Sequence, residues 1–199
     1  MYLYGASGHA RVIMDILRAQ GLVVEGLVDD NPLLTELDHV EVLHKSQGLS
    51  PFIVSIGVNT TRKKIVQKII SEGGTFGCAV HPEAILSPSA VVGEGTVVMA
   101  GALINAAVHI GRHCIINTGA SIDHECQIDD FVHISPHATL CGNVTVGEGT
   151  WIGAGSTVIP GVHIGRWAMI GAGSVITRDI PDAVLVVGYN RVIRKLNQD

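Results

Sequence analysis

Residues 115–134 read IINTGASIDHECQIDDFVHI, and every sixth residue in this stretch is isoleucine: Ile116, Ile122, Ile128 and Ile134. The same spacing runs without insertion from Leu86 to Ile176, always with Leu, Ile or Val. Two residues before each of these aliphatic residues stands a small or β-branched residue. A period of six does not fit the turn of a helix, and it is the period of a hexapeptide β-helix.

The pattern within each hexad explains how such a coil forms. Alternate side chains of a strand point to opposite faces, so the aliphatic residue and the small residue share the inward face. The remaining positions are rich in Gly, Asp, Asn and Pro, which favour turns. Three strand-and-turn hexads close a triangular coil, and about five such coils stack on one another.

Composition narrows the function classes. The 199 residues suit one or two small domains. Hydrophobic residues make up 47% and aromatic residues only 4%, which fits a narrow core filled by aliphatic side chains. The formal charge of −5 with 13 Lys and Arg gives no basic surface for a nucleic acid. Neither a signal peptide nor a long apolar run is present, so we expect a cytoplasmic protein without membrane insertion.

The four cysteines are expected to be thiols. Cys114 and Cys126 occupy inward small positions of the hexads, and Cys78 and Cys141 form no CxxC pair with them. Buried free thiols are therefore favoured over disulfides and over a thiolate zinc site.

The N-terminal third has a different pattern, in which short apolar strands alternate with helices. Strands are predicted at residues 1–4, 23–28, 52–56 and 76–80, and helices from about residue 12 to 20 and over 60–71. This alternation predicts an α/β domain with a small parallel sheet at residues 1–80, followed by an all-β β-helix and tail at 81–199.

Two polar turns of this domain can each be interpreted in two ways. The strand–turn–helix segment around Gly5 and Gly8 resembles half of a Rossmann unit, whose helix N-terminus offers backbone N–H groups to a phosphate, or it is merely a tight turn. Asp29 and Asp30 follow the second strand, where they can bind a hydroxyl or a base edge, or be solvated turn residues.

The β-helix carries one polar constellation. His124 and Glu125 occupy turn positions and project from a corner, and His133 lies in an outward strand position about half a coil further on. Imidazole titrates near neutral pH, and a neighbouring carboxylate would orient the ring as a general base. The alternative is that these are exposed residues of a polar corner.

Other histidines raise the alternative of a metal site. His109, His113, His133 and His137 leave open a zinc site shared between subunits, as in gamma-class carbonic anhydrases. Surface or interface positions are the simpler interpretation.

Taken together, several motifs resemble one family: the bacterial sugar-nucleotide acetyltransferases of the hexapeptide-repeat superfamily, the PglD/NeuD group. The resemblance covers nearly the whole chain. It rests on Tyr4-Gly5-Ala6-Ser7-Gly8-His9, Asp29-Asp30, Ile56-Gly57 with Arg62-Lys63-Lys64, His81-Pro82, Ser87-Pro88-Ser89-Ala90, Asp123-His124-Glu125-Cys126 and Phe131-Val132-His133-Ile134-Ser135.

The resemblance implies a Rossmann-like N-terminal domain joined to a left-handed parallel β-helix that forms a homotrimer, with the active site between subunits. It implies His124 as general base and Glu125 as its acidic partner. Substrate contacts are implied for Ser7, Gly8, His9, Asp29, Asp30 and Gly57. Acetyl-CoA contacts are implied for His133, for Gly142, and for the backbone at Ala154 and Ala172.

By that resemblance we expect an acetyl-CoA-dependent N-acetyltransferase that acts on a UDP-linked 4-amino-4,6-dideoxysugar and needs no metal. Alternatives are an O-acetyltransferase of the sialic-acid type and a non-catalytic nucleotide-sugar-binding subunit. Two features depart from the family. The tail around Gly188 and Arg191 lacks the usual proline, and His137 stands where family members often carry Gly.

Overall fold

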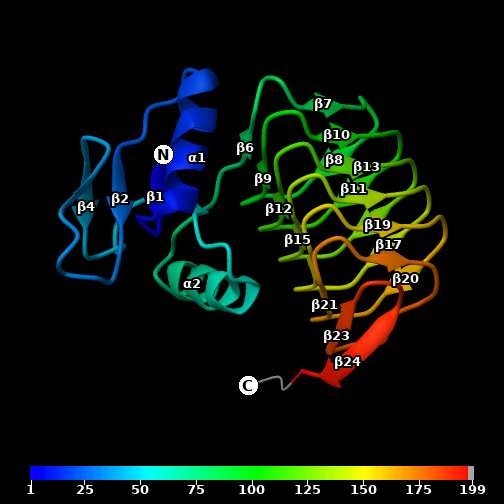
Figure 1. Ribbon diagram of the computed structural model, residues 1–199. Helices are drawn as coiled ribbons and strands as arrows, with labels where there is room; N and C mark the ends of the chain where they lie inside the picture. The colour runs from blue at the N-terminus through cyan, green and yellow to red at the C-terminus, as the bar shows by residue number, and fades with distance from the viewer. Residues whose placement is uncertain (197–199) are drawn as a thin grey trace.

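The hexads fold into a three-sided prism of stacked rungs (Figure 1). The computed structural model describes residues 1–196. Paired residues of neighbouring rungs are 18 positions apart, as Ile116 and Ile134 are. Three hexads therefore make one rung, and all neighbouring rungs pair in parallel. The predicted left-handed parallel β-helix is confirmed.

Each side of the prism is one sheet, in which the two-residue strands of the hexads pair in parallel and only the final strand, β24, is antiparallel. Face 1 holds β6 (Ala79–Val80), β9 (Val97–Val98), β12 (Ile115–Ile116), β15 (His133–Ile134), β18 (Trp151–Ile152), β21 (Met169–Ile170), β23 (Val184–Val187) and β24 (Arg191–Lys195). Face 2 holds β7 (Ile85–Leu86), β10 (Leu103–Ile104), β13 (Ser121–Ile122), β16 (Thr139–Leu140), β19 (Thr157–Val158) and β22 (Val175–Ile176). Face 3 holds β8 (Val91–Val92), β11 (His109–Ile110), β14 (Gln127–Ile128), β17 (Thr145–Val146) and β20 (His163–Ile164).

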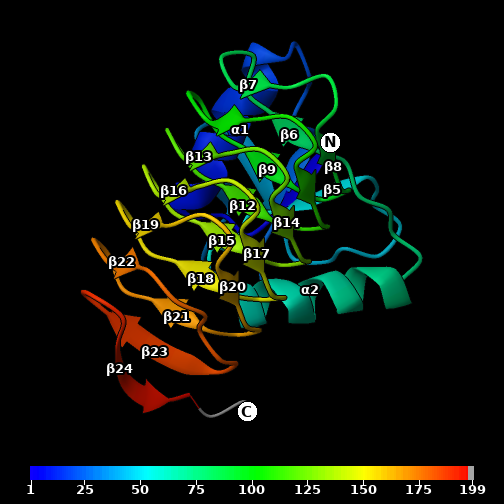
Figure 2. The same ribbon diagram turned by 90° about the vertical axis from the view of Figure 1, so that its right-hand side faces the viewer.

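The corners are named by the faces that they join. Figure 2 views the prism from the side opposite the N-terminal domain, and the strands of faces 2 and 3 form two columns there. The corner between these two columns is the 2/3 corner. The corner that leads from face 1 to face 2 is the 1/2 corner.

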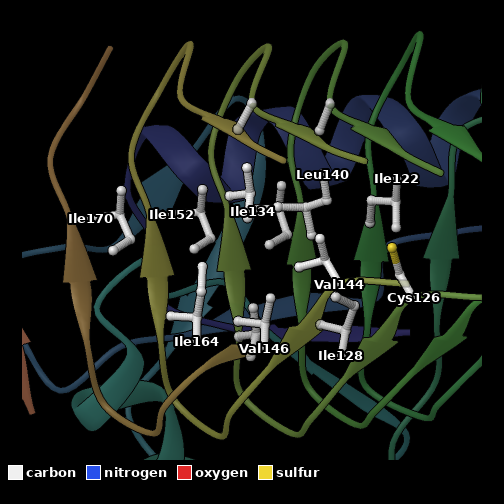
Figure 3. Close-up of a cluster of buried hydrophobic side chains, with 14 of the residues drawn as sticks. Ile122, Cys126, Ile128, Ile134, Leu140, Val144, Val146, Ile152, Ile164 and Ile170 are labelled. Atoms are coloured by element: carbon white, nitrogen blue, oxygen red, sulfur yellow. The ribbon is translucent and has the colours of Figure 1, made fainter. Parts of the chain in front are cut away.

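The inward aliphatic residues form one continuous core along the prism axis (Figure 3). From Ile104 to Ile176 every residue of the six-residue series is buried. Cys114 and Cys126 are also buried, and the four cysteines are free thiols. Burial raises the pKa of the Cys114 thiol to about 12, so it is not a nucleophile at neutral pH.

The N-terminal domain is a five-stranded sheet in the order β3-β4-β2-β1-β5. Its elements are β1 (Tyr2–Tyr4), α1 (Gly8–Ala19), β2 (Gly26–Val28), β3 (Glu36–Leu37), β4 (Val40–Leu43), β5 (Phe52–Val54) and α2 (Asn59–Ser71). Strands β2, β1 and β5 run in parallel, as predicted. Strand β4 also runs parallel to β2, whereas β3 pairs antiparallel with β4.

Some boundaries and elements differ from the sequence prediction. The hairpin β3–β4 was not predicted, because its turn is made by Asp38 and His39 with positive φ instead of by glycine. Residues 76–80 were predicted as one strand of the domain. Phe76 makes a single bridge to Phe52, and β6 is instead the first strand of face 1.

The N-terminal domain packs against the upper part of face 1 (Figure 1). Outward residues of that face, such as Val97 and Ile115, join Leu3 and Ile13 in one buried cluster. Helix α1 contacts β6. The two parts thus share an apolar interface, which fixes the domain on one side of the prism.

A buried arginine ties the two parts together. The Arg62 side chain is 1% exposed and donates to the carbonyls of His113 and Phe131 on the prism, each at 2.8 Å. It also donates to the carbonyls of Ile56 and Gly57 and to Asn59 Oδ1. Burial lowers the pKa of Arg62 to about 10, so the guanidinium stays charged at neutral pH.

The lower end of the prism is closed by the antiparallel hairpin of β23 and β24. Asn190 in its turn donates from Nδ2 to Thr177 Oγ1 and accepts from Thr177 N. The C-terminal segment around Gly188 and Arg191, which departs from the family pattern, thus forms this hairpin. Over residues 1–196, no helix combines the length and apolarity that a membrane crossing needs.

Candidate active site

The 2/3 corner brings His124 and Glu125 into contact. They lie in the turn between β13 and β14, and His124 Nδ1 lies 3.1 Å from Glu125 Oε2. Glu125 has a φ of 61°, and this left-handed turn folds the carboxylate back toward its neighbour. A neutral imidazole that donates from Nδ1 keeps its Nε2 lone pair free, as a general base requires.

The turn itself is held by residues to which the sequence assigned no role of their own. Asp123 Oδ1 accepts from the His124 backbone N–H at 2.8 Å and from Asn105 Nδ2 at 2.9 Å. These two hydrogen bonds, the one from His124 first, lower the pKa of Asp123. On the next rung, Asn143 N donates to His124 O at 2.8 Å. The backbone beneath the imidazole is therefore fixed on both sides.

The six residues predicted to contact substrate gather at one edge of the N-terminal sheet. Ser7, Gly8 and His9 follow β1, the two aspartates follow β2, and Gly57 follows β5. Because β2, β1 and β5 are parallel neighbours, their carboxyl ends meet there. This sheet edge also receives the N-terminus of α1, whose first residue is Gly8.

The two aspartates at this edge differ in their hydrogen bonding. Asp29 uses both carboxylate oxygens on backbone, accepting from Ala6 N at 2.8 Å and from Asn31 N at 2.9 Å. Asp30 accepts from the Tyr4 hydroxyl at 2.7 Å, and Tyr4 accepts in turn from Lys68 Nζ at 2.8 Å. Asp29 thus shapes the loops, while Asp30 is the better placed of the two to accept from a ligand.

His133 points outward from face 1, as predicted, but the structure buries it at 6% exposure. Its ring stacks on Trp151, with centroids 4.8 Å apart, and Asn117 Nδ2 lies 3.1 Å from His133 Nε2. Burial, with the Arg62 charge second, lowers the pKa of His133 to about 3. The ring is therefore neutral, and with Nε2 accepting from the amide its proton is on Nδ1.

The residues predicted to contact acetyl-CoA do not form one cluster in a single chain. His133 lies on face 1, and Ala154 and Ala172 are exposed on successive rungs of the 1/2 corner just below it. Gly142 instead lies at the 2/3 corner, directly under the His124 ring. His133, Ala154 and Ala172 thus lie on one side of the prism, and Gly142 lies beside His124 at another corner.

His124 and the sheet edge lie on opposite sides of one chain. In a three-sided prism the 2/3 corner faces away from face 1, which carries His133 and the N-terminal domain (Figures 1 and 2). Sequence spacing already indicated this, because residues 124 and 133 are half of an 18-residue rung apart.

The histidines considered for zinc are separated by the fold. His109 is exposed on face 3, whereas the His113 ring is buried between Phe76 and Phe131. Within residues 1–196, no group of three or more His, Cys, Asp or Glu side chains is arranged to hold a metal ion.

A cleft of about 400 Å³ that sequence analysis did not anticipate opens between α2 and the lower part of face 1. Trp151, Trp167 and Lys63 line it, and Lys63 pairs with Glu148. Because none of the predicted site residues lines this cleft, we do not assign it to the candidate active site.

Comparison with protein families identifies two regions. Residues 1–69 match the model of the PglD N-terminal domain, and residues 143–178 match the bacterial transferase hexapeptide model of six repeats. A curated relative, UDP-N-acetylbacillosamine N-acetyltransferase of Bacillus subtilis, is 41% identical over 108 residues. That alignment covers 49% of this chain, and the chain spans only half of the length of this relative.

Solved structures match almost the whole chain. Perosamine N-acetyltransferase from Caulobacter crescentus, a histidine-to-asparagine variant in complex with CoA and GDP-perosamine, is 40% identical. It covers 98% of this chain and 96% of its own, with a TM-score of 0.92. The acetyltransferase domain of PglB from Neisseria gonorrhoeae in complex with acetyl coenzyme A is 34% identical, with 98% of both chains covered and a TM-score of 0.87. Because identity of this level extends over nearly the full length of both chains, this protein belongs to the PglD-like family of hexapeptide-repeat sugar acetyltransferases.

Proposed function

We propose that this protein transfers the acetyl group of acetyl-CoA to the amino group of a nucleotide-linked amino sugar. The observation that carries the proposal is the His124–Glu125 pair, whose imidazole keeps Nε2 free at an exposed corner. The relatives agree in chemistry, since the names of two of them describe N-acetyltransferases of amino sugars. The similarity to these relatives therefore supports the same reaction for this chain.

His124 would act on the proton of the attacking amine. The nitrogen lone pair attacks the thioester carbonyl, a C–N bond forms, and Nε2 of His124 takes the N–H proton. The C–S bond then breaks, and the proton returns to the departing thiolate to give the thiol. Glu125 accepts the hydrogen bond from Nδ1 throughout and stabilises the imidazolium.

The negative oxygen of the tetrahedral intermediate needs a donor. A backbone N–H of the coil is the better candidate, because Nδ1 of the neutral His133 ring is buried within its own chain and its Nε2 lies against Asn117 Nδ2. A neutral donor suits this task, because it stabilises the oxyanion without itself losing the proton.

We further propose that the working unit is a homotrimer in which each site is shared between neighbouring chains. The base lies across the prism from the sheet edge of its own chain, so a substrate held at that edge can meet only the base of another copy. A closed ring of three copies brings every 2/3 corner to a neighbouring face 1 in the same way.

The substrate class follows from the sheet edge. Free backbone N–H groups at the start of α1 suit a diphosphate, and the Asp30 carboxylate suits the hydroxyl or N–H groups of a nucleoside. We propose a UDP-linked 4-amino-4,6-dideoxysugar, and the GDP-linked analogue is the nearest alternative, since relatives with each nucleotide are known. The free thiols fit a cytoplasmic location, because disulfides are rare in that compartment.

Thiol release from acetyl-CoA, measured against a panel of UDP- and GDP-linked amino sugars, tests this function. We expect release with at least one 4-amino sugar, and a mass increase of the sugar by one acetyl group. His124→Ala should lower kcat by about 10²- to 10⁴-fold, because a positioned base contributes that much. It should leave the fold intact, since the ring is exposed.

Two results would refute the assignment. The first is release that occurs only with sugars that lack an amino group, which would indicate O-acetylation. The second is near wild-type kcat in His124→Ala.

A further inference from the structure

The backbone conformation at Gly142 does not require a glycine. Equivalent positions of the 2/3 corner recur every 18 residues and are occupied by Pro88, Ala106, His124, Gly142 and Pro160. Proline and alanine are accepted at this position in other rungs, and Gly142 does not have the positive φ that favours glycine. The reason for the glycine must therefore lie outside the turn.

The neighbour above supplies that reason. A Cβ placed on Gly142 would lie 2.6 Å from both Cε1 and Nε2 of His124, far inside van der Waals contact. The three nearest atoms that it would meet all belong to this imidazole, and none is backbone. A side chain at 142 would therefore strain no part of the turn but would displace the ring.

We propose that Gly142 is a positioning residue for the base, an inference that rests on the proposed acetyl transfer. Asp123 fixes the His124 backbone N–H, Glu125 contacts Nδ1 of the ring, and the Nε2 edge occupies the space that a side chain at position 142 would fill. A methyl group in that space forces the ring to swing, which breaks the contact with Glu125 or turns Nε2 away from the amine.

Gly142→Ala tests the inference. We expect kcat to fall about 10- to 100-fold, within the range that general-base catalysis supplies, while KM for both substrates stays within about twofold. The melting temperature should not fall, because alanine in an allowed conformation restricts the unfolded chain. Ala106→Gly, the reciprocal one-methyl change a rung above, should keep wild-type kcat.

A second background separates positioning from a direct coenzyme contact. In His124→Ala, the added Gly142→Ala change should cost no further kcat, because the ring that it displaces is already gone. A raised KM for acetyl-CoA with unchanged kcat, or an equal loss in both backgrounds, would overturn the inference.

A readout without turnover keeps the inference distinct from the function. Imidazole ¹⁵N NMR of the unliganded protein should show His124 with its proton on Nδ1, and Gly142→Ala should change that signal. If no amino sugar is acetylated but the signal changes, the reaction assignment fails and the positioning stands. An unchanged signal would refute the positioning even in an active enzyme.

Discussion

At the residue scale, the two neighbouring acids after β2 have different tasks although the sequence pairs them. Asp29 uses both oxygens to fasten two loops, and Asp30 is oriented by Tyr4, whose hydroxyl is held by Lys68. Hydrogen bonding thus divides this pair of identical residues, and we propose a structural role for Asp29 and a ligand contact for Asp30.

Replacing each acid by its amide should separate these tasks. Asp30→Asn keeps the shape but loses the charge, and we expect it to raise KM for the nucleotide sugar about tenfold or more with little change in stability. Asp29→Asn has one oxygen for two backbone donors, and it should lower the free energy of unfolding by about 1–3 kcal/mol. Steady-state kinetics and urea denaturation measure the two effects, and the reverse pattern would contradict the division.

At the element scale, the attachment of the sheet edge to the prism depends on Arg62 on α2. Its guanidinium has only uncharged partners, and these come from both parts of the molecule. Since Gly57 is one of the partners, the same contact fixes the end of the β5 loop.

Arg62→Met should lower the stability of the protein, because the acceptors that Arg62 binds lose their hydrogen-bond donor. Methionine fills most of the space but donates no hydrogen bond, so buried carbonyls on both parts lose their partner. We expect a loss of about 2–5 kcal/mol in the free energy of unfolding, because each buried acceptor left unpaired costs about 1–3 kcal/mol and loss of the buried charge offsets part of this cost. Urea denaturation measures it, with the exposed Lys64→Met as a control of small effect. A loss below about 1 kcal/mol in Arg62→Met would contradict the role.

Buried histidines at the same interface predict how stability depends on pH. Burial lowers the pKa of His113 to about 4, with the charge of Arg112 second. Between its ordinary pKa near 6.5 and about 4, the unfolded chain binds a proton that the folded chain does not. The free energy of unfolding should therefore fall as the pH falls through this window. Above about pH 6.5, His113 is neutral in both states and does not affect the stability.

His113→Phe isolates this contribution, because Phe131 already occupies the equivalent position one rung below. In the variant, the slope of the unfolding free energy against pH should be smaller by up to about 1.4 kcal/mol per pH unit, which is the contribution of one proton. Urea denaturation at several pH values between 4 and 7 measures it. Parallel slopes for variant and wild type would show that His113 titrates normally in the folded protein.

At the scale of the whole molecule, the separation of base and sheet edge predicts complementation between defective chains. His124→Ala removes the base, and Gly8→Trp fills the sheet edge without meeting other atoms at its Cβ. Each variant alone should be inactive. Co-expressed chains should form mixed trimers in which about a quarter of the sites combine two intact halves.

Activity of the purified mixed trimers, compared with that of each variant alone, measures the effect. Light scattering gives the oligomeric state. Mixed trimers that are as inactive as the single variants would place each site within one chain.

The sequence predicted the prism closely, because its interior repeats one physical requirement in every hexad. It predicted His124 with Glu125 as a pair, and the corner geometry brings the two into contact. It could not foresee Arg62, which stands in a basic run with Lys63 and Lys64 yet is buried, since no local pattern reports which cation will be covered by another domain. It did not predict the hairpin of Glu36–Leu37 and Val40–Leu43, because Asp38 and His39 form its turn where glycine would have signalled one.

The 18-residue register restricts how such a protein can change its length. A single inserted residue within the prism would turn all inward side chains below it out of the core. An added rung of eighteen residues would leave every face in place and lengthen the prism by about 4.8 Å, the spacing of neighbouring strands. The length of the prism below His124 can thus change only by whole rungs. Relatives that accommodate longer or shorter ligands along the 1/2 corner should therefore differ in this part by multiples of eighteen residues.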